Sequence, residues 1–349
     1  MNTPWGYPDF DAHEALHFVT DETTGLRAII AMHSTHLGPA AGGTRFWHYS
    51  DDADALTDAL RLSRGMSYKN SMAGLPLGGG KAVVLADSSR TKTPEMLAAF
   101  ASAVDSLGGK YVTAEDVGMS VSDMIEISKK TKYVAGLPVG GGQVGGDPGP
   151  HTSLGVFLGI KAAVKRALGK DNLDGLHIAL QGAGSVAGGV ARQAAAEGAR
   201  LSIADVDQAR AEALAAETGG TVVAPGDLLS LEADVVSPCA LGAILTEESI
   251  AQLKTPIVAG GANNQLATAE DGKRLQARGI LYAPDYVINA GGIINVSTEY
   301  LGDGGPELVR SRVEAIPGRL EQIWSESAAS GQDPASVADA MAQKLIGRR

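Results

Sequence analysis

The sequence has few of the features that mark a secreted, membrane-bound or nucleic-acid-binding protein. Its 349 residues include one cysteine, Cys239, which cannot form an internal disulfide and therefore fits a reducing cytoplasm. No apolar run is long enough to cross a bilayer, and Met1 to Phe10 contains no apolar signal core, so we expect neither a membrane span nor a secretion signal. The net charge of -11 and the lack of a basic cluster disfavour a nucleic-acid partner.

Metal ligands and aromatic side chains are also scarce. The seven histidines show no pair at metal-ligand spacing, and the cysteine is solitary, so we expect no metal site. Aromatic residues make up 5% of the chain, which predicts a mainly aliphatic core. Glycine, in contrast, is abundant at 45 residues and is often clustered, which indicates places where backbone approaches another group closely or adopts positive φ.

The length predicts two domains, each long enough to bury its own core. The first third is typical of a mixed α/β domain, with a helix that precedes Lys69 and another that starts at Thr93-Pro94. Residues 136–150, rich in glycine and proline, are expected to form a loop before a helix at Thr152–Leu168. The expected strands of this region are Ala15–Val19, Leu26–Met32, Ala82–Ala86 and Tyr111–Thr113.

From Leu176 onward, short strands alternate with helices, which predicts a parallel, doubly wound α/β sheet. Two or three helices are expected to close the chain after Asn289. The expected strands are Leu176–Leu180, Leu201–Ala204, Val235–Ser237, Ile257–Ala259 and Ile280–Ala283. The expected helices between them are Ser185–Glu197, Asp207–Thr218, Glu247–Leu253 and Ala267–Arg278.

A glycine-rich segment, Gln181-Gly182-Ala183-Gly184-Ser185-Val186-Ala187, follows an expected strand and opens an expected helix. Gly182 permits the tight turn, Gly184 lets a pyrophosphate approach the backbone, and the small Ala187 lets helix and strand pack closely. The helix N-terminus at Ser185 and Val186 would then face the phosphates. The alternative is an ordinary glycine-rich turn, but the strand–turn–helix order favours a dinucleotide site.

Asp205 ends the next expected strand, eighteen residues after Ala187. A carboxylate at that place accepts hydrogen bonds from the adenosine ribose hydroxyls and repels a 2′-phosphate. The sequence therefore predicts NAD, rather than NADP, as the cofactor.

Lys69 and Lys81 lie twelve residues apart in apolar, glycine-rich surroundings. Each is either an ordinary surface lysine or a catalytic or ligand-binding one. If the two ammonium groups shared a cleft, repulsion and desolvation would lower the pKa of one and provide a neutral general base. Asp116, after an expected strand, is on its own typical of a turn or a helix cap. Gly74–Lys81 is not a phosphate-binding P-loop, because the serine or threonine required next is replaced by alanine.

Several blocks in a fixed order resemble the glutamate/leucine/phenylalanine/valine dehydrogenase superfamily over nearly the whole chain, and its leucine or phenylalanine dehydrogenase branch in particular. These blocks are Leu37–Arg45, Tyr68–Asn70, Leu75–Lys81, Thr113–Gly118, Gly146–Pro148, the Gly182 fingerprint, Ser237–Ala240, Ala262–Leu266 and Asn289–Gly292. The resemblance implies a substrate-binding and oligomerisation domain at residues 1–135, a Rossmann-type NAD domain at 136–328 and a C-terminal helix at 329–349 that returns to the first domain. It also implies an active-site cleft between the two domains and a homo-oligomer, either a dimer or an octamer.

The resemblance further implies reversible oxidative deamination of an apolar L-amino acid to its 2-oxo acid and ammonia. Lys81 would be the general base and Asp116 would assist proton transfer at the amine. Lys69 and Asn263 would hold the substrate α-carboxylate beside the backbone of Gly42 and Gly43. The cofactor would meet, beyond the glycine-rich segment and Asp205, the residues Thr152, Asn289, Cys239 and Ala240.

The substrate side chain would be selected by Ala41, Ala114, Ile293 and Val296, which match the pocket positions of the family. Ala41 and Val296 replace polar residues of the glutamate enzymes, so a γ-carboxylate would be buried without a partner. The β-branched Ile293 and Val296 favour leucine and other branched-chain substrates, whereas Ala41 leaves room for phenylalanine. Gly149 departs from a position that is often serine in the family.

Two other functions stay open at this point. One is a non-catalytic NAD-binding protein, which would need none of Lys69, Lys81 and Asp116. The other is a dehydrogenase of a different class, such as one for hydroxy acids, which usually relies on a histidine with a carboxylate and an arginine. No such constellation stands out in the sequence.

Overall fold

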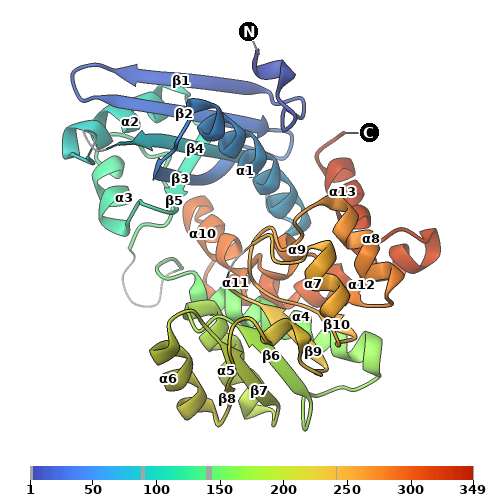
Figure 1. Cartoon of the computed structure of the whole chain (residues 1–349). Coiled ribbons are helices and arrows are strands. Elements are labelled where there is room, and N and C mark those ends of the chain that lie inside the picture. The colour runs from blue at the N-terminus through green and yellow to red at the C-terminus, as the bar shows by residue number, and fades with distance from the viewer. Residues whose placement is uncertain (1–2, 88–90, 139–143, 241, 349) are drawn as a thin grey trace. The chain divides into compact units, whose positions relative to one another are not determined.

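The computed structural model describes residues 3–87, 91–138, 144–240 and 242–348. Of the expected loop at 136–150, residues 139–143 therefore lie outside the described part. The chain divides into two compact units (Figure 1). Unit 1 comprises Met1–Gly146, Val296–Pro306 and Ala342–Arg349, and unit 2 comprises Asp147–Asn295 and Glu307–Met341.

Unit 1 is built on a five-stranded mixed sheet with the order β1-β2-β4-β3-β5. β1 and β2 form an antiparallel pair, β2 and β4 are antiparallel, and β3 lies parallel to both β4 and β5. The strands are β1 (Ala15–Asp21), β2 (Leu26–Ser34), β3 (Ala40–His48), β4 (Gly78–Ala86) and β5 (Tyr111–Glu115). Four of them were predicted in type and place. β3, which lies between β4 and β5, was not, and β4 starts four residues earlier than Ala82.

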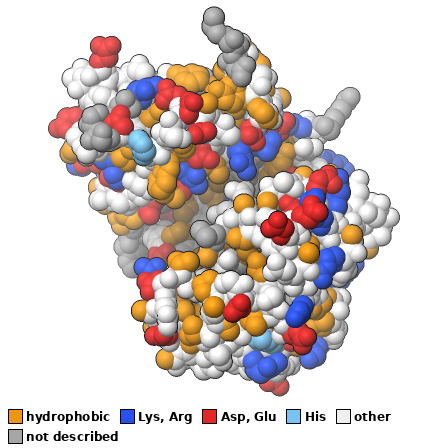
Figure 2. Space-filling view, in the orientation of Figure 1, with side chains coloured by type: hydrophobic (Ala, Val, Ile, Leu, Met, Phe, Trp, Pro, Cys, Tyr) orange, Lys and Arg blue, Asp and Glu red, His pale blue; other side chains and the backbone are white. Residues whose placement is uncertain are grey.

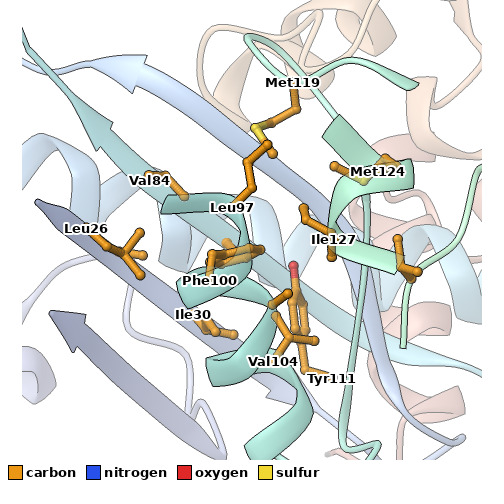
Figure 3. Close-up of a cluster of buried hydrophobic side chains, with 14 of the residues drawn as sticks. Leu26, Ile30, Val84, Leu97, Phe100, Val104, Tyr111, Met119, Met124 and Ile127 are labelled. Atoms are coloured by element: carbon orange, nitrogen blue, oxygen red, sulfur yellow. The ribbon is translucent and has the colours of Figure 1, made fainter. Parts of the chain in front are cut away.

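Helices cover both faces of this sheet. α2 (Pro94–Ser106) begins as predicted at Thr93, whose side chain accepts a hydrogen bond from the Met96 N–H. α3 (Val121–Ser128), which was not predicted, begins with a reciprocal capping box between Ser120 and Asp123. Figure 3 shows the apolar cluster that these two helices form with the sheet, with Phe100, Ile127 and Tyr111 among its members. The core is mainly aliphatic, as predicted.

The opposite face of the sheet packs against α1 (Asp52–Met72), whose N-cap Asp51 accepts from the Ala53 N–H. Leu56 and Leu60 of this helix are buried against Ile29 and Val83 of the sheet. The predicted helix before Lys69 therefore exists, and Lys69 itself lies in its last turn.

Unit 2 contains a six-stranded sheet of order β11-β10-β9-β6-β7-β8, in which every pairing is parallel. The prediction of a doubly wound parallel sheet is confirmed. The strands are β6 (His177–Gln181), β7 (Arg200–Ala204), β8 (Thr221–Val222), β9 (Val235–Pro238), β10 (Ile257–Val258) and β11 (Leu281–Tyr282). The helices that connect them are α5 (Ser185–Ala196), α6 (Gln208–Thr218), α7 (Glu247–Gln252) and α8 (Ala269–Ala277), and α9 (Asp285–Ile288) follows β11.

Further helices flank this alternating region. α4 (Gly149–Leu168) precedes it and starts three residues before the predicted Thr152. In the described residues after Asn289, four helices follow, so the expectation of two or three was wrong. They are α10 (Gly291–Leu301), α11 (Pro306–Glu314), α12 (Ile316–Ser330) and α13 (Pro334–Leu345). Pro306 and Pro334 start separate helices here because proline fits the first turn but not a helix interior.

The two units differ in their bounds from the expected domains. The expected boundary after residue 135 lies inside unit 1, because the Ala135 N–H donates to the Thr113 carbonyl at 2.8 Å and Gly136 N–H donates to Glu299 Oε2 at 2.7 Å. The final segment groups with unit 1 from Ala342 rather than from residue 329. There, Gln343 Nε2 donates to the Tyr68 hydroxyl at 3.0 Å.

The charged side chains of the surface are mixed in sign on the face that is drawn (Figure 2). On the face drawn in Figure 2, acidic and basic side chains are interspersed rather than gathered in one extended patch. Within the described ranges, no helix is both long and apolar enough to span a membrane.

We predict that the α2–α3 core carries much of the stability of unit 1. Ile127→Ala, at a fully buried side chain, should lower the free energy of unfolding by about 2–5 kcal/mol, because it leaves a cavity. Ile125→Ala on the same helix, at a side chain that is 40% exposed, is the matched control and should cost less than about 1 kcal/mol. Urea unfolding of both variants measures the difference, and equal losses would contradict this account of the core.

Candidate active site

Three strands of unit 1 bring together most of the residues expected to act on the substrate. β3 carries Gly42 and Gly43, and its parallel neighbour β4 carries Lys81, with Ala41 aligned to Gly79. Asp116 follows the end of β5, on the other side of β3. The predicted catalytic pair is thus formed by residues 35 positions apart that meet across the sheet.

Lys81, which is buried, forms an ion pair with the half-buried Asp116. The Lys81 residue is only 6% exposed, and its Nζ donates to Asp116 Oδ2. Arg45 Nε approaches the same Asp116 oxygen at 3.3 Å, and its Nη1 donates to Asp58 Oδ2 at 2.8 Å. One carboxylate oxygen therefore faces two cations.

This arrangement sets the protonation of both partners. Burial lowers the pKa of Lys81, the attraction to Asp116 partly opposes that shift, and the charge of Arg45 adds to it. Burial alone would raise the pKa of Asp116, but the charges of Lys81 and Arg45 outweigh it, so the pKa of this carboxyl lies below its usual value. A lysine with a lowered pKa gives up its proton at a lower pH than an ordinary lysine does, which suits it to act as a general base. From the sequence, repulsion between Lys69 and Lys81 was expected to lower the pKa of one of them if they shared a cleft, whereas the cation among the strongest contributors at Lys81 is Arg45.

Two glycines are required by the close approach of backbone in this site. A Cβ at Gly43 would lie 2.8 Å from the Asp116 Cβ, so any side chain there would displace the carboxylate. A Cβ at Gly79 would lie 2.0 Å from the Ser67 backbone N, so α1 rests directly on β4. Asn70 Nδ2 also donates to the Gly78 carbonyl at 2.6 Å. These contacts fix the last turn of α1, which carries the half-buried Lys69, to the start of β4.

An apolar cluster of unit 1 contains three of the four expected side-chain pocket residues, Ala41, Ala114 and Val296. Ile293 lies three residues before Val296 on α10, a spacing that puts both on one face of that helix. Sequence reasoning missed the other members of the cluster, which are Leu77, Val112, Ala135, Tyr300 and Leu301. Each is apolar at the contact, so the cluster offers a γ-carboxylate no cationic partner.

In unit 2, the glycine-rich segment forms the expected turn between β6 and α5. Gly182 has a φ of 102°, a value that favours glycine, and its N–H donates to the Ala204 carbonyl at 2.7 Å. Gly184 is the N-cap of α5 and supplies no side-chain cap, so the first-turn N–H groups of Ser185, Val186 and Ala187 lie at an uncapped helix terminus. A Cβ at Gly184 would meet no atom within 4 Å, which leaves its backbone open to approach. Such a terminus is suited to bind a phosphate.

The neighbouring strand ends supply the other residues expected near a cofactor. Asp205, after β7, accepts from the Ala183 N–H at 2.7 Å and so also holds the glycine-rich turn. Cys239 and Ala240, after β9, lie against Gly182, where a Cβ would be 3.2 Å from the Ala240 Cβ. Burial raises the pKa of the Cys239 thiol, which keeps it protonated and disfavours a catalytic role. All these residues follow the carboxyl ends of parallel strands, where doubly wound sheets bind ligands.

Asn263 and Asn289 also meet in unit 2. Asn263 lies in the loop after β10 and Asn289 at the end of α9, and Asn289 Nδ2 donates to Asn263 Oδ1 at 2.8 Å. The segment after Asn289 packs on the first turn of α4, because a Cβ at Gly292 would lie 2.7 Å from Thr152 Oγ1. The structure therefore brings Thr152 beside the segment that Asn289 begins.

The departure at Gly149 has a local explanation. A Cβ at Gly149 would lie 2.2 Å from Ser185 Oγ and 3.3 Å from the Ser185 Cβ. The Ser185 hydroxyl occupies the space that a side chain at residue 149 would need, so such a side chain would require the Ser185 hydroxyl to rotate away.

The sequence patterns predicted no metal site. Across residues 3–87, 91–138, 144–240 and 242–348, no group of three or more His, Cys, Asp or Glu side chains could hold a metal ion.

Arg45 was part of a block that carried the resemblance, yet it had no expected role. Recognition of Thr44, Phe46 and Trp47 as strand formers would have placed it on β3 beside the catalytic pair.

Comparison with known proteins identifies the family of this chain. Residues 13–133 match the family described as Glu/Leu/Phe/Val dehydrogenase, dimerisation domain, and residues 202–342 match Glutamate/Leucine/Phenylalanine/Valine dehydrogenase. The chain is 45% identical to leucine dehydrogenase of Bacillus subtilis (strain 168), over 96% of this chain and 92% of that protein. It is 42% identical to phenylalanine dehydrogenase of Bacillus thermotolerans, over 97% and 89%. The crystal structure of L-tryptophan dehydrogenase from Nostoc punctiforme superposes with a TM-score of 0.85 at 42% identity, covering 96% of each chain.

We predict that Gly149 and Ser185 can be exchanged only together. Gly149→Ser should raise the dissociation constant for NAD about fivefold or more, because the new side chain overlaps Ser185 at the uncapped start of α5. Adding Ser185→Gly removes the overlap and should restore binding towards the original value. Fluorescence titration with NADH measures both variants, and a double variant that binds no better than Gly149→Ser would contradict the coupling.

Proposed function

Because the chain belongs to the Glu/Leu/Phe/Val dehydrogenase family, we propose that it catalyses the reversible NAD-dependent oxidative deamination of an apolar L-amino acid. The products are the 2-oxo acid and ammonia. The observation that carries the proposal is the ion pair of the buried Lys81 with Asp116, in which burial and Arg45 lower the pKa of the lysine. A protein that only bound NAD would have no need to bury these charges, since each costs free energy when removed from water.

The described residues of unit 2 fit a dinucleotide. The uncapped start of α5 offers N–H groups for the pyrophosphate, and Gly184 leaves its backbone accessible. Asp205 favours NAD over NADP, because a carboxylate repels a 2′-phosphate. Thr152, Cys239, Ala240 and Asn289 would surround the rest of the cofactor. When bound, the dinucleotide supplies the two-electron oxidant for the substrate Cα.

Lys69 and Asn263 would hold the α-carboxylate of the substrate, together with the backbone of Gly42 and Gly43. An ammonium group and an amide N–H suit a carboxylate, which accepts hydrogen bonds but donates none. Fixing this end of the substrate orients its Cα and its amine for reaction.

Lys81 and Asp116 would move the protons. In oxidation, neutral Lys81 removes a proton from the water that adds to the imino carbon of the oxidised substrate, and the oxygen of that water becomes the keto oxygen. Asp116 stabilises the resulting Lys81 ammonium and assists protonation of the departing amine. Overall, amino acid and water give 2-oxo acid and ammonia, and two electrons leave with the cofactor.

The proposed substrate preference is for leucine and related branched-chain amino acids. The cluster around Ala41, Ala114 and Val296 is apolar, so a glutamate side chain would lose its hydration without gaining a partner. The identity of 45% to a leucine dehydrogenase supports the same preference. An aromatic substrate is the second candidate, because Ala41, Ala114 and Ala135 are small and the chain is similar to phenylalanine and tryptophan dehydrogenases.

Two further features belong to the proposal. Residues 13–133 match a dimerisation domain, and we propose a homo-oligomer, either a dimer or an octamer. The single cysteine supports activity in the reducing cytoplasm. The expected cleft between the two domains stays a prediction.

The direct test is NADH formation from NAD with L-leucine, valine, isoleucine, phenylalanine, tryptophan and glutamate. We expect strong turnover of a branched-chain amino acid and almost none of glutamate, because a buried unpaired carboxylate is costly. Oxidation of NADH by the matching 2-oxo acid should require ammonium, which a hydroxy-acid dehydrogenase would not. Turnover of no amino acid by a protein that binds NAD would refute the proposal, and turnover highest with phenylalanine or tryptophan would select the second candidate.

We predict that Lys81→Ala lowers kcat by about 10²-fold or more while the dissociation constant for NADH changes less than about twofold. The reason is that the proton acceptor is lost while the groups of unit 2 are untouched. Lys92→Ala is the matched control, since Lys92 also pairs with an aspartate of unit 1, Asp123, at 2.5 Å. Near-normal turnover of Lys81→Ala would rule out this lysine as the base.

A further inference from the structure

Two buried amide side chains hold the loop that carries Asn263. Three successive carbonyls of this loop, those of Gly260, Gly261 and Ala262, each accept a hydrogen bond from one of them. Gln265, which is fully buried, donates its Nε2 to Gly260 at 2.7 Å and to Ala262 at 3.0 Å. Asn289, which is 4% exposed, donates its Nδ2 to Gly261 at 3.1 Å.

The loop is also fixed from its other end. Asn264 has a φ of 52°, a left-handed conformation that is uncommon for residues other than glycine. Its carbonyl accepts from the Ala243 N–H at 2.6 Å, and the Gln265 N–H donates to Asp285 Oδ2 at 2.7 Å. Such a conformation persists only where the surroundings hold it, which is typical of ligand-binding segments.

The contacts of Asn289 determine which way round the Asn263 amide lies. The Gly261 carbonyl can only accept, so Asn289 must turn its NH₂ group, and not its oxygen, towards it. The second N–H of that group then points at Asn263, whose Oδ1 accepts the hydrogen bond at 2.8 Å. Because its oxygen is engaged there, the amide of Asn263 is oriented with its NH₂ group on the edge that faces away from Asn289.

We propose that Asn289 is a positioning residue for recognition of the substrate α-carboxylate, acting through Asn263. This inference rests on the proposed function, in which Asn263 binds that carboxylate. A carboxylate has only acceptors, so an Asn263 amide in the opposite orientation would set oxygen against oxygen. Both N–H groups of the Asn289 amide donate to protein acceptors. Its buried Oδ1 has no hydrogen-bond partner in the described part of the chain. It therefore has no N–H left to donate to a cofactor.

Asn289→Asp tests the proposal, because aspartate has the same shape but sets oxygens against the Gly261 carbonyl and Asn263 Oδ1. Asn263 then reverses to donate its NH₂ to the new carboxylate and turns its oxygen towards the substrate. We expect KM for the 2-oxo acid to rise about tenfold or more, and by a larger factor than the dissociation constant for NADH, which Asn289 would also adjoin.

A second readout reports the orientation of Asn263 directly. The wild-type enzyme should bind 4-methylpentanoate, as a competitive inhibitor, more tightly than 4-methylpentanamide. Asn289→Asp should lower that preference about tenfold or more, since an amide can donate to the reversed Asn263 oxygen and a carboxylate cannot. If Asn289→Asp fails to fold, Asn289→Ala, which frees Asn263 to reverse without adding a charge, should lower the preference in the same direction.

Gln265→Glu is the matched control. It sets oxygens against the Gly260 and Ala262 carbonyls in the same loop but does not touch the Asn263 amide, so the carboxylate preference should stay at the wild-type value. An unchanged preference in Asn289→Asp, an equal loss in Gln265→Glu, or an effect confined to NADH binding would each overturn the inference. These outcomes differ from failure of the proposed function, which would be a wild-type enzyme that deaminates no amino acid.

Discussion

Burial of the Lys81 charge is the constraint on which unit 1 depends. A lysine held in the middle of a sheet needs an opposite charge, and Asp116 reaches it only because Gly43 of the strand between them has no side chain. Arg45 lowers the pKa of both partners, since its positive charge stabilises the Asp116 carboxylate and disfavours the Lys81 ammonium. These three charged groups destabilise the fold when they are buried, and in the proposed chemistry the same three groups would provide the proton acceptor.

Unit 2 differs from unit 1 because its candidate binding groups are hydrogen-bond donors that suit anions. The start of α5 lacks a side-chain cap, so its N–H groups are directed at whatever lies beyond Gly184. In the loop after β10, buried Asn289 sets which edge of Asn263 can meet a carboxylate. In both places the backbone or an amide supplies the donors, which is how an acidic protein with a net charge of -11 would bind the proposed acidic ligands.

The sequence could predict those features that depend on local order. The strand–turn–helix around Gly182 and the alternation after Leu176 were recognisable because neighbours along the chain form them. The resemblance named Lys81 and Asp116, but their pairing needs a sheet order that periodicity does not determine. β3 was missed because the glycines at its centre are not typical of a strand, although its neighbours approach too closely for side chains there. The role of Arg45, which lies on β3, was missed for the same reason. The reciprocal fit of Gly149 and Ser185 is likewise a tertiary contact.

The measurement that tests this account most directly is the pH dependence of kcat/KM for amino-acid oxidation, in the wild type and in Arg45→Met. The acidic limb should report deprotonation of Lys81, at a pH below the ordinary lysine value of 10.5, because burial lowers its pKa. Removing the Arg45 charge removes a contribution that lowers this pKa, so the limb should move to higher pH. A limb that stays in place or moves to lower pH in Arg45→Met would contradict the claim that these charges make Lys81 the base.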